Sequence, residues 1–160
     1  MTILFLHGLR EDPENNNILQ ALKTTGNTII HPRLNPWEPI KTLESLKQYS
    51  PDLCIGFSLG GLFASALNIG RKILINPALC FPNILKQRKR PETELIKEYE
   101  SFPWFHVQNL KAIFTTEDEK VGLKSLPIFL NHYPESEITY IPGGHNLTKT
   151  QILETLIPMI

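Results

Sequence analysis

The sequence has little cysteine and no long apolar run, and both features exclude whole classes of protein. Its two cysteines, Cys54 and Cys80, are too few for a disulfide scaffold, and their apolar surroundings suit buried, reduced thiols. No stretch approaches the roughly 18 uninterrupted apolar residues that a membrane-spanning helix needs. The first residues also lack the basic region and the long apolar segment of a signal peptide. We therefore expect a cytoplasmic protein that does not bind membranes.

An excess of charge of either sign is missing as well. The chain has 16 lysine and arginine residues against 16 aspartate and glutamate residues, so its net charge is zero. This balance gives no electrostatic argument for binding nucleic acid. Repeats and low-complexity tracts, which would indicate a solenoid or a disordered chain, are also absent from the sequence. Its 160 residues, 41% of them hydrophobic, suffice for a core, and we expect a single domain over residues 1–160.

Short apolar runs alternate along the chain with longer amphipathic segments. The expected strands are Thr2–Leu6, Thr28–Ile30, Asp52–Phe57, Arg71–Ile75, Lys111–Thr115 and Ile138–Ile141. The expected helices are Asn15–Thr24, Ile40–Tyr49, Leu62–Asn68, Val121–His132 with an interruption at Pro127, and Leu147–Ile157. Such alternation predicts an α/β fold, a three-layer sandwich with helices on both faces of a parallel six-stranded sheet. With the strands numbered along the chain, and with right-handed crossovers, we expect the order 2-1-3-4-5-6.

One long segment, residues 78–107, interrupts this alternation and predicts a lid-like excursion over the sheet. Its apolar side chains, with Phe81 and Trp104 among them, either line a site for an acyl group or pack the excursion onto the sheet. Trp37, in a proline-flanked loop, is another weak candidate for substrate binding, with a packed loop as the alternative. The basic run Lys86–Arg90 is most often a solvated face, but it would also suit acidic or phosphate-bearing substrates.

The strongest chemical signal is the Gly-x-Ser-x-Gly pattern at Gly56–Gly60, which falls between a predicted buried strand and a helix. In this position the central residue, Ser58, sits on a sharp, strained turn with its hydroxyl accessible. The residues two before and two after the serine crowd each other, so both must be small. A glycine-rich turn that only tightens helix–strand packing is the alternative. A phosphate-binding loop is disfavoured, because the pattern lacks the Gly-Lys-Ser/Thr ending.

A serine nucleophile needs a base, and the base needs an acid to orient it. Among the histidines after Ser58, His145 follows the last predicted strand and is the best candidate for the base, whereas His106 and His132 suit surface or packing roles. Asp118 is the only aspartate after Ser58 and follows the fifth predicted strand. Capping the next helix is its alternative role. Its neighbours, residues 117 and 119, are glutamates that could replace it as the acid.

Two backbone N–H groups are needed to stabilise an oxyanion in this chemistry. The N–H of Leu59, directly after the serine, is one candidate. The N–H of Leu9, in the loop after the first strand, is the other, because Gly8 permits a close backbone approach. We expect His7 to hold this loop through hydrogen bonds.

Together these residues resemble the alpha/beta-hydrolase superfamily, and within it the small bacterial YqiA/YcfP-like esterases. The resemblance spans nearly the whole chain and rests on Leu6-His7-Gly8, Gly56-Phe57-Ser58-Leu59-Gly60-Gly61, Leu74-Ile75-Asn76-Pro77-Ala78, Asp118-Glu119 and Gly143-Gly144-His145. It implies a Ser58–Asp118–His145 catalytic triad and hydrolysis of esters, or of thioesters, with short acyl chains.

The sequence thus predicts a serine esterase with a small-molecule substrate, without a cofactor and without a metal. A thioesterase or acyltransferase with the same triad is one alternative. A non-catalytic module that uses the same fold to bind a ligand is the other, because a fold alone does not decide function. Neither the natural substrate nor the oligomeric state follows from the sequence.

Overall fold

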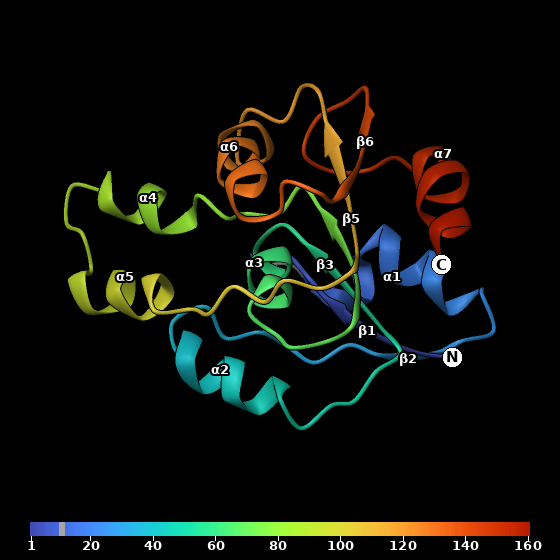
Figure 1. Ribbon diagram of the computed structural model, residues 1–160, viewed down its shortest axis with the longest axis horizontal. Helices are drawn as coiled ribbons and strands as arrows, with labels where there is room; N and C mark the ends of the chain where they lie inside the picture. The colour runs from blue at the N-terminus through green and yellow to red at the C-terminus, as the bar shows by residue number, and fades with distance from the viewer. Residues whose placement is uncertain (10–11) are drawn as a thin grey trace.

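Six short strands form one parallel sheet in the computed structural model, which describes residues 1–9 and 12–160 (Figure 1). They are β1 (Thr2–Leu6), β2 (Thr28–Ile30), β3 (Leu53–Phe57), β4 (Arg71–Ile75), β5 (Asn109–Thr115) and β6 (Glu137–Ile141). Their order across the sheet is β2-β1-β3-β4-β5-β6, and every neighbouring pair is parallel. The predicted α/β class and strand order are confirmed.

Helices cover both faces of this sheet because its central strands are apolar on both sides. In β1, Leu4 and Leu6 pack into one core, whereas Ile3 and Phe5 pack into the other. The first core is shared with α2 (Pro39–Leu46), α3 (Leu59–Ser65), α4 (Phe81–Lys86), α5 (Thr93–Glu100) and α6 (Gly122–His132). The second is shared with α1 (Asn17–Lys23) and the C-terminal helical segment, which lie together in Figure 1. The fold is therefore a three-layer sandwich.

Several helix ends differ from the sequence-based expectation; α2, for example, ends at Leu46 where Tyr49 was expected. Helix α3 begins at Leu59, directly after the serine, whereas the apolar pattern placed its start at Leu62. Helix α6 runs without a break through Pro127, so the expected interruption was wrong. Proline removes the N–H that would bond to the carbonyl four residues earlier, here that of Leu123. Because Leu123 is exposed, water can satisfy that carbonyl and the helix continues.

The C-terminal segment is also less regular than predicted. The expected helix Leu147–Ile157 is instead a short α7 (Lys149–Gln151), followed by a π-helical turn over Ile152–Leu156 and a 3₁₀ turn over Ile157–Met159. Thr148 begins it with a capping box, in which its side chain accepts from the N–H of Gln151 and the Gln151 side chain accepts from the N–H of Thr148. The buried face is nevertheless the predicted one, since Ile152 and Leu156 pack on the sheet.

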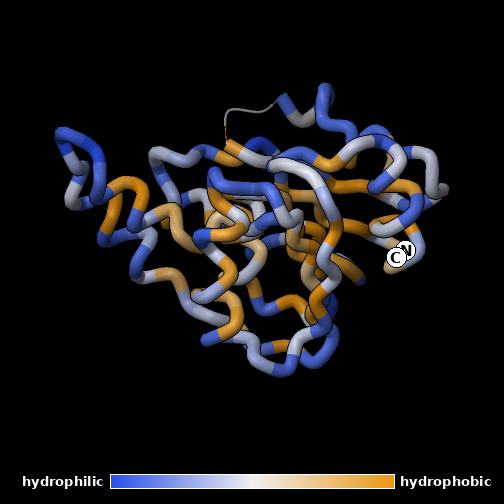
Figure 2. Tube along the Cα trace, turned by 90° about the horizontal axis from the view of Figure 1, so that it is seen from above, coloured by the Kyte–Doolittle hydropathy of each residue, from blue (hydrophilic) through white to orange (hydrophobic). Residues whose placement is uncertain are grey.

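Residues 78–107 contain α4 and α5, which project from the rest of the molecule (Figure 1). Helix α5 packs on α4 and α2, and Tyr99 and Phe102 of this segment contact Phe63 of α3. The turn between α4 and α5 is hydrophilic and forms the outermost tip of the projection in Figure 2. Lys86, the last residue of α4, forms an ion pair with Glu100, the last residue of α5. The segment is thus a helical hairpin with an apolar base and a polar tip.

Candidate active site

The turn between β3 and α3 carries Ser58 in a strained conformation. Its φ of 52° and ψ of −119° are rare for a residue other than glycine. The N–H of Ser58 donates to the carbonyl of Ile75 at the end of β4 (3.0 Å), and its carbonyl accepts from the N–H of Ala78 (2.8 Å). These bonds to the neighbouring chain segment hold the turn in place. The result is the strand–serine–helix geometry that the sequence pattern predicts.

Two glycines make this turn sterically feasible. A Cβ atom on Gly56 would lie 2.6 Å from the carbonyl oxygen of Gly60, and one on Gly60 would lie 2.0 Å from the carbonyl oxygen of Leu6. Any side chain at either position would therefore collide with backbone. The close approach also sets the first turn of α3 against the end of β1. The loop after β1 is consequently a direct neighbour of Ser58.

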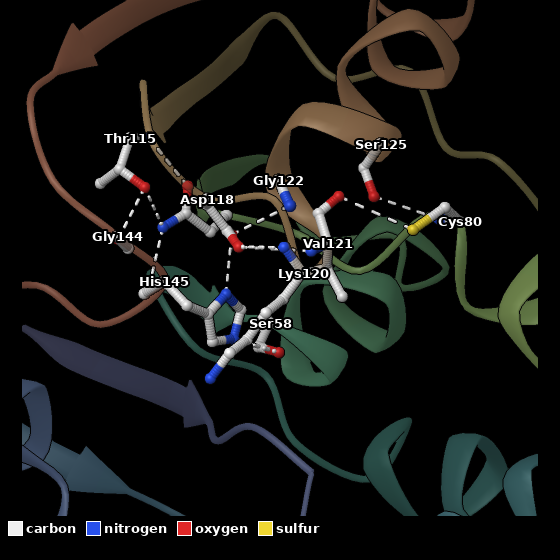
Figure 3. Close-up of polar contacts among 11 residues, drawn as sticks. Ser58, Cys80, Thr115, Asp118, Lys120, Val121, Gly122, Ser125, Gly144 and His145 are labelled. Atoms are coloured by element: carbon white, nitrogen blue, oxygen red, sulfur yellow. Dashed lines mark hydrogen bonds and ion pairs between the residues drawn. The ribbon is translucent and has the colours of Figure 1, made fainter.

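Ser58, His145 and Asp118 meet at the carboxyl edge of the sheet, although 87 residues separate Ser58 from His145 and 27 residues separate His145 from Asp118 along the chain. The Nε2 atom of His145 lies 3.0 Å from the Ser58 Oγ atom, and its Nδ1 atom lies 2.7 Å from Asp118 Oδ2 (Figure 3). Because a carboxylate only accepts, the Nδ1 atom carries the proton and donates it to Asp118. In the neutral ring, Nε2 is then free to accept the proton of the serine hydroxyl.

The carboxylate of Asp118 is buried and fully hydrogen-bonded. Besides His145, its oxygens accept from the N–H groups of Lys120 (3.1 Å), Val121 (3.3 Å) and Gly122 (2.9 Å). Burial alone would raise the pKa of this carboxyl, but the hydrogen bond and charge of His145, with the N–H groups of Val121 and Gly122, hold the pKa below its ordinary value. Asp118 therefore stays ionised at neutral pH, and it both orients the histidine and caps the start of α6.

The other residues that the sequence offered as acid or base are not part of this hydrogen-bonded arrangement. Glu117 and Glu119 are exposed, and neither is the carboxylate that contacts His145. His132 ends α6 and stacks on Trp104, with ring centroids 3.8 Å apart. His106 contacts the ring of Tyr133 (5.5 Å), just beyond that helix. Both histidines therefore have packing roles, at the end of α6 opposite Asp118.

The two residues whose N–H groups are expected to stabilise an oxyanion belong to different elements. Leu59 is the first residue of α3, so its N–H belongs to the helix start that lacks intrahelical partners. Leu9 follows the β1 loop that Gly60 contacts. His7 braces this loop, because its Nε2 accepts from the N–H of Leu34 (3.1 Å) and its Nδ1 therefore carries a proton and donates to the carbonyl of Gly8 (2.7 Å).

The three weak candidates for substrate binding all form packing contacts with other side chains. Phe81 is buried against Tyr99, with ring centroids 5.1 Å apart, and Trp104 stacks on His132 at the far end of α6. Trp37 is about half exposed, and the Arg88 guanidinium lies over its ring at 6.0 Å. These contacts pack the hairpin and its surroundings.

A small cavity lies beside the loop that carries His145. Its volume is about 100 Å³, and it is lined by Asn15, Asn16, Asn17, Ile18, Phe57, Asn146 and Leu147. Phe57 precedes the serine, and its ring packs on that of His145 with centroids 5.1 Å apart. Of these residues, only Phe57 belongs to a motif that the sequence indicates. A run of three asparagines far from any catalytic motif gives no signal until the fold brings it next to the histidine loop.

Comparison with known proteins identifies the fold of the chain. No family model matches the chain, and no curated protein matches it in sequence. Solved structures do match it. A hydrolase candidate from Agrobacterium vitis S4 superposes with a TM-score of 0.75 at 15% identity, and Est1E from Butyrivibrio proteoclasticus with 0.73 at 16%. Both alignments cover 99% of this chain and 87% of the other.

A third structure, methylketone synthase I from tomato, superposes with a TM-score of 0.66 at 13% identity, over 99% of this chain and 96% of that one. At such identities the likeness concerns the fold. The chain therefore has the alpha/beta-hydrolase fold, as the sequence motifs predicted. The narrower resemblance to the YqiA/YcfP-like esterases stays a prediction.

Two kinds of feature are absent from residues 1–9 and 12–160. No cluster of three or more histidine, cysteine, aspartate or glutamate side chains there has a geometry that could hold a metal ion. No helix in the same residues has the length and apolar character to cross a bilayer.

Proposed function

We propose that this protein is a serine hydrolase that cleaves carboxylic esters with short acyl chains. Ser58 is the nucleophile, His145 the general base and Asp118 the acid that orients the base. One observation carries this proposal: a serine on a strained strand–helix turn lies 3.0 Å from a histidine whose other ring nitrogen is bound to a buried aspartate. A packing role would not require the strained backbone of Ser58.

The reaction proceeds through an acyl-enzyme. The Ser58 Oγ atom attacks the ester carbonyl carbon while His145 Nε2 takes up the hydroxyl proton. The N–H groups of Leu59 and Leu9 stabilise the oxyanion, and the imidazolium is stabilised by Asp118. His145 then gives its proton to the departing alcohol. A water molecule, activated by the same histidine, hydrolyses the acyl-enzyme and restores Ser58.

The space beside the base favours a small substrate. A cavity of about 100 Å³, lined by the chain neighbours of Ser58 and His145 but by neither of the two, accommodates only a few non-hydrogen atoms, and its asparagine side chains suit a polar, uncharged group. The basic turn between α4 and α5 argues less strongly for a phosphate-bearing thioester, because Lys86 and Arg88 form ion pairs with Glu100 and Glu92. We therefore place a simple ester ahead of a thioester.

Replacing the nucleophile tests the proposal. Ser58→Ala should lower hydrolysis of a short-chain p-nitrophenyl ester at least ~10³-fold, because a triad without its nucleophile keeps only binding and oxyanion stabilisation. Ser101→Ala, at an exposed serine that ends α5, is the matched control and should hydrolyse the ester at the wild-type rate. Circular dichroism checks that both variants fold. Equal rates for Ser58→Ala and wild type would place the chemistry elsewhere.

Assays with other acyl donors and acceptors separate the alternative functions. A thioesterase or acyltransferase would also lose activity in Ser58→Ala, but it would prefer a thioester of the same acyl chain, or transfer the acyl group to an added alcohol. A binding module would show no Ser58-dependent turnover with any acyl donor. The proposed esterase hydrolyses the oxygen ester faster than the matching thioester.

A further inference from the structure

A buried amide outside the triad connects the loops that carry the acid and the base. Asn76 directly follows β4, is fully buried, and has a φ of 39°, in the left-handed region that asparagine tolerates better than most residues. Its N–H donates to the carbonyl of Ile113 (2.9 Å), which extends the pairing of β4 with β5 by one residue. From this position the side chain reaches across the end of β5.

Every polar atom of this side chain has a partner. The Oδ1 atom of Asn76 accepts from the N–H of Thr115 (2.9 Å), and Nδ2 donates to Thr115 Oγ1 (2.9 Å) and to the carbonyl of His145 (2.9 Å). Thr115 Oγ1 in turn donates to the carbonyl of Gly144 (2.8 Å). The directions are fixed, because an N–H only donates and a carbonyl only accepts. An inverted amide would set two donors against each other.

The network holds the backbone on which the base is mounted. Two consecutive carbonyls, those of Gly144 and His145, are bound by Thr115 and Asn76, whose positions the sheet fixes (Figure 3 shows Thr115, Gly144 and His145). Gly143, just before them, has a φ of 118°, a conformation that favours glycine. The two residues that precede His145 are thus glycines, which restrict the backbone little by themselves. Backbone pairing with the acid loop adds a bond from the N–H of Glu117 to the carbonyl of Gly143 (3.0 Å).

We propose that Asn76 and Thr115 form a positioning pair that keeps the His145 ring between Ser58 and Asp118. The pair contacts the backbone of His145, not the reacting atoms, so it acts through the base. This inference rests on the proposed function and extends it to the supporting network. A shift of about 1 Å in a catalytic group can lower a rate roughly 100-fold, so a tether at this position bears directly on turnover.

Substitutions at Thr115 test the pair with little change in volume. Thr115→Val removes the hydroxyl and should lower kcat about 10- to 100-fold while KM changes little, because the base is misplaced and the substrate still binds. Thr115→Ser keeps the hydroxyl and should restore most of the activity. Asn76→Gly suits the left-handed backbone, removes both side-chain donors, and should resemble Thr115→Val. Thr42→Val is the matched control, since Thr42 of α2 is also buried and its hydroxyl donates to the carbonyl of Asn35.

A second readout does not depend on turnover. The proton that His145 Nδ1 donates to Asp118 should give a separate, strongly downfield NMR signal in the wild type and in Thr42→Val. That signal should broaden or disappear in Thr115→Val and Asn76→Gly. If these two variants melt earlier but keep the wild-type kcat and the His145 signal, the pair is only structural and the proposal is overturned. A wild type that shows the signal but no ester hydrolysis would contradict the proposed function and leave the positioning test intact.

Discussion

At the scale of single residues, Asp118 shows how one buried carboxylate serves two ends of the site. One oxygen binds the imidazole of His145 and the N–H of Gly122, and the other binds the N–H groups of Lys120 and Val121. The helix start thereby holds the carboxylate through three hydrogen bonds that do not involve the histidine. The sequence offered capping and catalysis as alternatives for Asp118, and the geometry combines them.

Asp118→Asn should separate these two roles. The amide has one acceptor oxygen instead of two, so it cannot accept from His145 and Gly122 with one atom and from Lys120 and Val121 with the other, and an NH₂ group facing the ring would favour its wrong tautomer. We expect kcat to fall about 10³- to 10⁴-fold, with KM nearly unchanged. Glu119→Gln, at the exposed neighbour, is the control and should match the wild type. Ester hydrolysis by Asp118→Asn within tenfold of the control would remove Asp118 from the mechanism.

At the scale of elements, the contact between α3 and β1 positions the serine. Gly60→Ala should prevent this contact, because the added Cβ would lie 2.0 Å from the Leu6 carbonyl oxygen, and that backbone belongs to the central sheet. We expect a loss of about 3 kcal/mol or more in the free energy of unfolding, measured by urea denaturation. Gly70→Ala is the control, since nothing lies within 4 Å of its added Cβ. Equal stability of the two variants would show that α3 can move away from β1.

The strands and helices show which parts of the fold could be predicted from the sequence. The strands were predicted to within two residues, because a buried parallel strand is an apolar run that ends at a polar or glycine-containing turn. The start of α3 was missed, since Gly60 and Gly61 looked like a turn but continue a helix. The break expected at Pro127 was wrong, because the exposure of Leu123 depends on tertiary packing.

The residues of the site also fall into those that the sequence identified and those that it did not. Ser58, Asp118 and His145 were identifiable because the serine pattern and the chain order leave few choices. Asn76 entered only as part of a resemblance, and Thr115 only as the last residue of a strand. Their function depends on contacts across 39 and 69 residues of chain, which no local pattern reveals.

At the scale of the whole molecule, the core contains a buried amine that the proposed reaction does not use. Lys72 in β4 is fully buried, lies opposite Cys54 of β3, and donates to the carbonyl of Ser65 (3.3 Å). Burial lowers the pKa of Lys72 to about 8, and burial raises the pKa of the Cys54 thiol to about 12. The charged form of Lys72 is therefore disfavoured in the folded protein. At neutral pH, burial of this charge lowers the free energy of unfolding.

Lys72→Met should stabilise the protein at pH 7 by on the order of 2 kcal/mol. Between about pH 8 and the ordinary lysine pKa, the unfolded chain binds more protons than the folded one, so wild-type stability rises with pH. The advantage of Lys72→Met should therefore be full below pH 8 and shrink as the pH rises through this window. Lys124→Met, at an exposed position on α6, is the control and should show no such trend. Urea denaturation at several pH values checks this, and a pH-independent difference would contradict the assigned pKa.

The reactivity of Ser58 toward a fluorophosphonate probe tests the central claim most directly, because the probe reports an activated serine without knowledge of the natural substrate. We predict that mass spectrometry finds one adduct per wild-type molecule, located on Ser58, and none on Ser58→Ala. His145→Ala should react at least ~100-fold more slowly, because the base that activates the hydroxyl is gone. A folded wild type that stays unmodified, or that carries the adduct on another residue, would contradict the account.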